Sequence, residues 1–163
     1  MPLYKKILNK LLYKGFSVST AESCTGGLLA YSFTKNKDSS KVFKGGYITY
    51  SNELKINDLN VKKINLKKYG AVSREIAKEM TIGLYLKNKT QICIITTGIA
   101  GPGGASKNKP IGLVYIGIRI YGKINIIKKN FKGTRIQIQK KCVKFIFKYL
   151  DKSIWDTICS LFK

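Results

Sequence analysis

Residues 91–104 read QICIITTGIAGPGG, and this stretch indicates the fold class most directly. Its first seven residues are mostly apolar or β-branched, and a glycine-rich loop, 98–104, follows them at once. A short apolar run bounded by such a loop is typical of a strand that is covered on both faces, as in the parallel sheets of α/β proteins. We therefore expect a buried central strand at 91–97, whose carboxyl end leads into a loop suited to ligand contact.

The rest of the chain alternates helical and strand patterns around this stretch. Helices are expected at 3–14, 26–34, 52–59, 73–87, 134–150 and 154–162. Strands are expected at 16–20, 43–50, 91–97, 111–121 and 123–131. Gly15 ends the first helix, Ser73 caps the fourth, and the last two strands form an antiparallel hairpin around Gly122. We predict a single α/β domain over residues 1–163, a three-layer α/β/α arrangement whose mixed sheet has helices on both faces.

The composition restricts the chemistry that this chain can perform. Its 163 residues include no histidine, and 31 Lys and Arg against 8 Asp and Glu give a net charge of +23. The absence of histidine excludes a Ser–His–Asp triad, a Cys–His pair and a histidine-ligated metal. Acid–base chemistry must therefore use lysine, tyrosine, cysteine or one of the eight carboxylates.

The excess of lysine has two interpretations. Only 3 of the 31 basic residues are arginine, and the lysines are spread along the whole chain. An A/T-rich genome favours lysine at tolerant surface positions, which would make the charge a matter of composition. The alternative is a protein that binds nucleic acid or another polyanion. Sequence-specific base reading favours arginine, so we expect non-specific polyanion binding at low salt.

The cysteines and the hydropathy predict a cytoplasmic protein with no membrane contact. Cys24, Cys93, Cys142 and Cys159 form no Cys-x-x-Cys pair, so we expect free thiols and no zinc site. The first residues alternate lysine with apolar side chains and lack the features of a signal peptide. No stretch approaches the roughly 20 apolar residues of a membrane span.

Two loops are candidates for a catalytic site. AESCTGG, at 21–27, lies between an expected strand and helix, and 98–104 follows the central strand. Neither fits a phosphate-binding P-loop, a dinucleotide-binding Gly-x-Gly-x-x-Gly or a Gly-x-Ser-x-Gly nucleophile elbow. The first loop leaves Ser23, Cys24 or Thr25 as a nucleophile, at a helix start whose free N–H groups favour anions.

A base for that nucleophile is available between residues 45 and 55, GGYITYSNELK, which carry two tyrosines and Lys55. Composition alone does not select one lysine among 28. Four segments are more specific than composition: STAESCTGG (19–27), FKGGYITYSNELK (43–55), YGAVS (69–73) and TGIAGPGG (97–104). Together they resemble the CinA carboxy-terminal domain family, the nicotinamide-nucleotide amidases. The resemblance covers nearly the whole chain in order.

The resemblance implies an activity and a domain organisation. The activity is hydrolysis of the carboxamide of nicotinamide mononucleotide to nicotinate mononucleotide and ammonia, in pyridine-nucleotide salvage. It also implies a homo-oligomer. Because the chain lacks histidine and has no clustered Cys, Asp and Glu ligands, we expect that no cofactor and no metal is needed. The amidase domain is expected to stand alone, without the pyrophosphatase-like domain that precedes it in longer family members.

The resemblance also assigns site residues. It implies a catalytic group of Ser23, Lys55 and Tyr50, in which Lys55 takes the serine proton and Tyr50 orients Lys55 or relays a proton to the leaving ammonia. The substrate contacts that it implies are Thr25, Gly26, Gly27, Gly101 and Arg135. The chain departs from the family pattern at Thr134, where an acidic residue commonly precedes the arginine, at Ala105, and in lacking a second arginine along the following helix.

Overall fold

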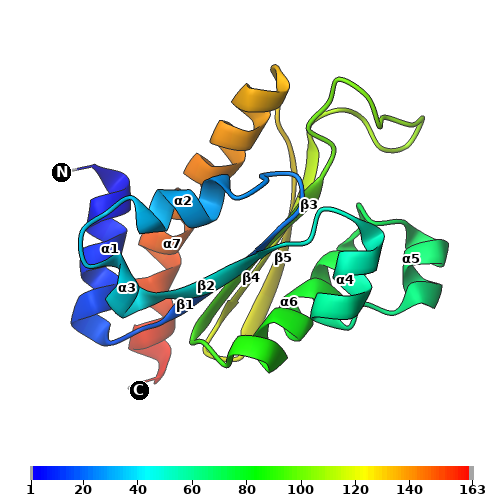
Figure 1. The fold of residues 1–163 in the computed structure, drawn as a ribbon. Helices are drawn as coiled ribbons and strands as arrows, with labels where there is room; N and C mark the ends of the chain where they lie inside the picture. Colours follow the sequence, from blue (N-terminus) through cyan, green and yellow to red (C-terminus); the bar gives the residue numbers. More distant parts are fainter. Residues whose placement is uncertain (1, 162–163) are drawn as a thin grey trace.

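A five-stranded mixed sheet forms the centre of the protein (Figure 1). The computed structural model describes residues 2–161, with side chains as far as residue 154. The strands are β1 (Val18–Glu22), β2 (Phe43–Ile48), β3 (Ile92–Gly98), β4 (Leu113–Ile120) and β5 (Lys123–Asn130). Their order in the sheet is β2-β1-β3-β4-β5. The strands β2, β1 and β3 run parallel, and β4 is antiparallel to both of its neighbours.

Helices cover both faces of this sheet (Figure 1). They are α1 (Leu3–Lys14), α2 (Leu28–Thr34), α3 (Ser39–Val42), α4 (Asn52–Leu59), α5 (Lys63–Tyr69), α6 (Arg74–Asn88) and α7 (Arg135–Leu161). The helices α1, α2 and α7 pack on one face, and α4, α5 and α6 pack on the other. The expected three-layer α/β/α class with a mixed sheet is confirmed.

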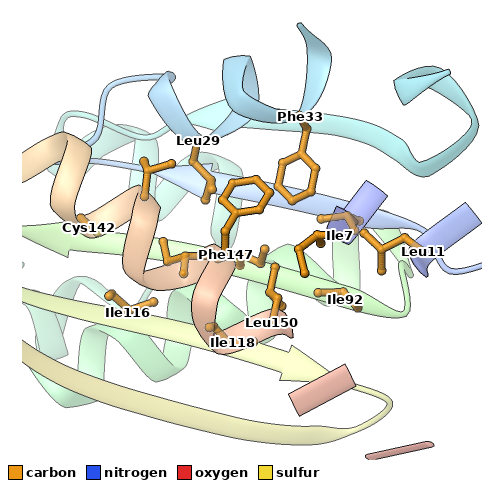
Figure 2. Packing of buried hydrophobic residues seen from close by; sticks show 14 of the residues in the cluster. Ile7, Leu11, Leu29, Phe33, Ile92, Ile116, Ile118, Cys142, Phe147 and Leu150 are labelled. Atoms are coloured by element: carbon orange, nitrogen blue, oxygen red, sulfur yellow. The ribbon is translucent and has the colours of Figure 1, made fainter. Parts of the chain in front are cut away.

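The central strand β3 explains why the stretch at 91–97 is so continuously apolar. Ile92 and Ile94 belong to the apolar cluster under α1, α2 and α7, whereas Cys93 and Ile95 belong to the cluster under α6. Successive side chains of a strand point to opposite faces, so both sets must be apolar when both faces are covered. Figure 2 shows the first cluster, in which side chains from the three helices meet over β3 and β4: Ile7, Leu11, Leu29, Phe33, Phe147 and Leu150.

Several expected boundaries are confirmed by the local geometry. Gly15 ends α1 in the left-handed conformation, with φ of 64°. The Ser73 hydroxyl accepts a hydrogen bond from the Ile76 N–H and caps α6. The hairpin between β4 and β5 turns at Tyr121 and Gly122, where φ is 45° and 90°. Positive φ at both residues is the requirement of a tight type I′ hairpin turn.

Other expectations about the elements were wrong. The expected helices at 134–150 and 154–162 are one continuous helix, α7, of 27 residues. The first strand lies at Val18–Glu22, two residues later than expected. The helix expected from residue 26 begins at Leu28, because Gly26 and Gly27 have positive φ and cannot be helical. The short helices α3 and α5 were not expected.

The structure describes three of the four cysteines, which were expected to be free thiols. Cys24, Cys93 and Cys142 are free and buried, while the side chain of Cys159 lies outside the described residues. Over the part of the chain that the structure describes, no helix combines the length and apolarity needed to cross a membrane, α7 included.

Candidate active site

The topology of the sheet creates a crevice at the carboxyl ends of β1 and β3. The chain leaves β1 through α2 toward β2 at one edge, and it returns through α4, α5 and α6 to β3 on the other side of β1. The loops after β1 and β3 therefore lead away from each other, one toward β2 and the other toward β4, and open α/β sheets bind ligands at such a point. The two loops do lie at neighbouring strand ends, as expected, and the Ser23 N–H donates to the Thr96 carbonyl at 2.9 Å.

A cavity of about 230 Å³ opens in this crevice. Its walls come from the loop after β1, the start of α4, the segment before α6, the loop after β3 and the first residue of α7. The residues that line it are Ser23, Cys24, Tyr50, Asn52, Lys55, Ala71, Val72, Thr97, Gly98, Ile99, Ala100, Gly101, Gly103, Gly104 and Arg135.

Lys55 is the most unusual side chain in this cavity, because it is a lysine with only 1% of its surface exposed. Its Nζ lies 3.2 Å from the Ser23 hydroxyl oxygen. It also donates to the backbone carbonyls of Thr49 at 2.8 Å, Ser51 at 3.3 Å and Tyr50 at 3.4 Å. No carboxylate among the described residues forms an ion pair with it. Burial therefore lowers the pKa of Lys55 below its ordinary value of 10.5.

The start of α4 places this amine. The Ser51 hydroxyl accepts from the Leu54 N–H at 3.1 Å, so the helix begins at Asn52 and Lys55 follows one turn later. Side chains of a helix lean toward its amino end, and this direction brings the amine back to the carbonyls of residues 49–51.

The acceptors around Lys55 distinguish its two protonation states. Carbonyl oxygens can only accept, whereas the Ser23 hydroxyl can accept or donate. A neutral amine has two N–H groups, enough for two of the three carbonyls, and one lone pair, to which the Ser23 O–H can donate. In this arrangement a neutral Lys55 can accept the Ser23 proton.

Cys24 was the main alternative nucleophile, and its surroundings disfavour that role. It is 6% exposed and belongs to the apolar cluster under α2 and α7. Burial raises the pKa of the Cys24 thiol to about 12. The thiolate is the reactive form of cysteine, so this thiol is inert near neutral pH.

Glu22 corrects the expectation of free N–H groups at the start of α2. Its carboxylate is 1% exposed and accepts hydrogen bonds from the N–H groups of Gly27 at 3.1 Å, Leu29 at 3.0 Å and Ala30 at 2.7 Å. The anion that this helix start binds is therefore the protein's own carboxylate.

Tyr50 does not point toward Lys55. Its side chain is 61% exposed, and its hydroxyl accepts from Arg135 Nη1 at 3.4 Å. The expected role of Tyr50, orienting Lys55 or relaying a proton, stays a prediction, and the hydrogen bond between the two residues uses the backbone carbonyl of Tyr50. Tyr50 and Arg135 together form one side of the cavity mouth.

The expected substrate contacts divide into two groups. Gly101 and Arg135 line the cavity, whereas Thr25, Gly26 and Gly27 do not. The Thr25 hydroxyl is buried against the Thr96 hydroxyl at 2.7 Å, so it supports the loop from beneath. The Gly27 N–H is used by Glu22.

The structure adds residues that the sequence reasoning missed. Asn52, Ala71, Val72 and Thr97 line the cavity, and all four lie in the family-like segments 43–55, 69–73 and 97–104. Gln139 of α7 donates its side-chain amide to the Cys24 carbonyl at 2.9 Å and so ties α7 to the nucleophile loop. No sequence signal indicated this contact, because the two residues are 115 positions apart.

Comparison with known proteins assigns the family. The sequence model of the CinA C-terminal domain matches residues 1–154, nearly the whole chain. This chain belongs to the CinA C-terminal domain family. Among solved structures, the competence damage-inducible protein A (ComA) of Klebsiella pneumoniae superposes with a TM-score of 0.90 at 30% identity, covering 93% of this chain and 94% of that one. The CihA protein of Agrobacterium tumefaciens superposes with a TM-score of 0.88 at 36% identity, covering 91% of both chains.

Two curated relatives are longer than this chain. A protein of Clostridium kluyveri, provisionally named competence-damage inducible, is 47% identical over 151 residues, which are 92% of this chain and 37% of that protein. A protein of the same provisional name from Clostridium botulinum strain Langeland is 48% identical over 152 residues, again 37% of its length. The chain therefore spans little more than a third of these relatives.

Proposed function

We propose that this CinA-family domain is an amidohydrolase that converts nicotinamide mononucleotide to nicotinate mononucleotide and ammonia. The observation that carries the proposal is the 3.2 Å approach of the buried Lys55 amine to the Ser23 hydroxyl inside a cavity at the switch point of the sheet. A chain without histidine needs such a pair for acyl transfer. The substrate is taken from the resemblance to the nicotinamide-nucleotide amidases.

In the first half of the reaction, neutral Lys55 removes the Ser23 proton while the serine oxygen attacks the carboxamide carbon. The resulting oxyanion needs N–H donors. The Gly26 N–H already donates to the Ser23 carbonyl at 3.2 Å, so we assign this role to the N–H groups of Cys24 and Thr25. Protonated Lys55 returns the proton to the leaving nitrogen, the C–N bond breaks, and ammonia departs from an acyl-serine ester.

In the second half, a water molecule attacks the ester carbon while Lys55, neutral again, removes a proton from it. The C–O bond to Ser23 breaks, and the proton passes from Lys55 to the serine oxygen. The carboxylic acid leaves as its carboxylate, and the enzyme returns to its starting state. One amide and one water give one acid and one ammonia, so no cofactor or metal is required.

Arg135 and Tyr50 at the cavity mouth are the proposed contacts for the nucleotide part of the substrate. Arginine offers a bidentate grip for a phosphate group. Tyr50, with most of its ring exposed, offers a surface for a planar ring. Thr134, next to Arg135, places no carboxylate there that would compete for the guanidinium.

Ammonia release from nicotinamide mononucleotide is the direct test. Purified protein, Ser23→Ala and Arg135→Gln are compared at several substrate concentrations. We expect wild type to turn over, Ser23→Ala to be inactive, and Arg135→Gln to show a raised KM as its main defect. A wild-type protein that releases no ammonia would contradict the proposal.

The net charge of +23 favours a second candidate, a polyanion-binding protein on the same fold whose amidase activity is reduced or lost. Duplex DNA binding that persists at physiological salt, in a protein inactive on nicotinamide mononucleotide, would favour this second function.

A further inference from the structure

A second hollow lies at the amino end of the central strand β3, whereas the catalytic cavity lies at the carboxyl end of this strand. It has a volume of about 340 Å³ and is formed by the end of α6, the start of β3 and the turn between β4 and β5. The strand β3 has 7 residues, which at about 3.3 Å each separate the two sites by roughly 20 Å. This hollow therefore cannot be a subsite of the amidase cavity.

Arg119 supplies the first reason to assign a ligand to this hollow. Its guanidinium carbon lies 3.4 Å from the ring centroid of Tyr85, which is a stacked arrangement. No ion pair or hydrogen bond to the guanidinium of Arg119 occurs within the described residues. Stacking uses the face of the guanidinium and leaves the N–H groups of its edge for a planar or tetrahedral oxyanion.

The rest of the wall is polar, positively charged and held in place. Lys89 brings a second cation, with Nζ 5.0 Å from the Tyr85 centroid. The Gln91 side-chain oxygen accepts from the Ser17 N–H at 2.9 Å and the Ser17 hydroxyl at 2.6 Å. This fixes the amide of Gln91 and leaves its NH₂ group to donate. The Gln91 carbonyl accepts from the Tyr121 N–H at 3.1 Å, so the two sides of the hollow are linked before any ligand arrives.

We propose that this hollow binds a phosphate group, either free or carried by a small phosphate ester. Arg119 and Lys89 supply two positive charges, and among the residues that the structure describes no acidic side chain lines the hollow to oppose them. The exposed ring of Tyr121 gives the wall an aromatic surface that a planar ester group can contact. The proposal is independent of the amidase activity, since none of these residues lines the catalytic cavity.

Amide chemical shifts of ¹⁵N-labelled protein locate the binding. Inorganic phosphate is titrated at constant ionic strength, with sodium chloride replaced in equivalent amounts so that screening does not change. We expect saturable shifts at residues 89–91 and 121–122. Shifts that do not saturate, or that lie mainly elsewhere on the chain, would overturn the proposal.

Matched variants separate this site from the general positive charge. Arg119→Gln should weaken phosphate binding at least tenfold. Arg74→Gln loses the same charge from a residue that donates to the Ile126 carbonyl, and it should stay within twofold of wild type. Equal weakening by both variants would show that net charge alone binds the anion and would refute the site.

Two further measurements guard against misfolding and identify the source of the phosphate. Lys89→Gln alters an exposed side chain, so we expect the variant to keep its fold. It should bind phosphate about threefold more weakly than wild type. Unchanged phosphate affinity would contradict the assignment of Lys89 and Arg119 as a pair of phosphate-binding cations. Phenyl phosphate is compared with inorganic phosphate. Tighter binding of phenyl phosphate together with a larger shift at Tyr121 identifies an ester as the ligand, and equal affinity identifies the free anion.

Discussion

Replacing Lys55 tests the mechanism most directly. Lys55→Met keeps a long, unbranched side chain in a site that is 1% exposed but removes the amine that lies 3.2 Å from the Ser23 hydroxyl. Lys55→Arg keeps the positive charge but cannot act as a base, because a guanidinium does not lose its proton in this range. The two variants therefore separate proton transfer from electrostatics.

The expected loss follows from the role that the geometry gives to Lys55. A positioned general base contributes about 10²–10⁴-fold to the rate, so both variants should lose at least that factor in kcat/KM. Arginine is also larger than lysine, and overpacking a buried site costs about 1–3 kcal/mol. A domain of ordinary stability, about 5–15 kcal/mol, remains folded after this cost. Thermal unfolding of each variant checks that the loss is not a folding defect.

The pH dependence of kcat/KM gives the second readout. Below the pKa of Lys55 the neutral fraction rises tenfold per pH unit, so log kcat/KM should rise with unit slope and level off below 10.5. Because burial, and not a distant charge, lowers this pKa, raising the salt concentration should hardly move the inflection. An active Lys55→Arg enzyme, or an inflection that moves strongly with salt, would refute the assignment of Lys55 as a desolvated base.

The structure supports further predictions of the same kind. Ser23→Ala should abolish ammonia release while Cys24→Ala keeps most of it, and the reverse pattern would move the nucleophile to the thiol. Glu22→Gln should lower the free energy of unfolding by about 2–3 kcal/mol, because the buried Glu22 carboxylate accepts hydrogen bonds from three N–H groups. Replacing the exposed Glu75 by Gln should change the free energy of unfolding by less than about 0.5 kcal/mol. Equal effects of the two variants in urea unfolding would contradict this. Between the lowered pKa of Lys55 and 10.5 the unfolded chain binds more protons than the folded one, so wild type should gain stability relative to Lys55→Met as pH rises; a flat or falling difference would be inconsistent with a buried neutral amine. Duplex DNA binding, measured by fluorescence anisotropy, should weaken with a log–log salt slope of about −0.9 per phosphate contacted and vanish by physiological salt, and sequence-selective binding that survives there would disagree.

Local sequence signals predicted the elements whose cause is local. The strand β3 could be predicted because covering both faces requires an unbroken apolar run. The helix α4 has the expected bounds because Ser51 caps it and the hydrogen bond to the Leu54 N–H fixes its start. The hairpin could be predicted because a Gly-containing pair between two strand-like runs favours a turn with positive φ.

Tertiary contacts decided the elements that the sequence reasoning missed. The polar residues 151–153 resemble a break between two helices, yet Asp151 forms ion pairs with Lys6, at 2.9 Å, and Lys10 of α1, so α7 continues through them. The helix α5 has a single buried side chain, Leu66, and a pattern that weak does not predict a helix.

The candidate site shows the same division. Strand-end loops and the absence of histidine indicated a hydroxyl or thiol nucleophile with a lysine or tyrosine base. Selecting Lys55 among 28 lysines required the family resemblance, because burial is a property of the folded chain. The outward position of the Tyr50 side chain could not be predicted for the same reason. The motif identifies the residue, whereas the direction of its side chain depends on the folded structure.

The contacts of Glu22 give a reason why the proposed nucleophile, Ser23, would need a buried base. A serine at the start of a helix ordinarily gains from the N–H groups and partial positive charge there. In this protein the Glu22 carboxylate takes three of those N–H groups, so the helix α2 gives Ser23 little electrostatic activation. Activation must then come from proton removal, which requires an amine that is neutral near the working pH. Full burial of Lys55, without a carboxylate partner among the described residues, meets this requirement. We therefore expect Glu22→Gln to lower the free energy of unfolding much more than it lowers kcat/KM. Lys55→Met should lower kcat/KM much more than it lowers the free energy of unfolding.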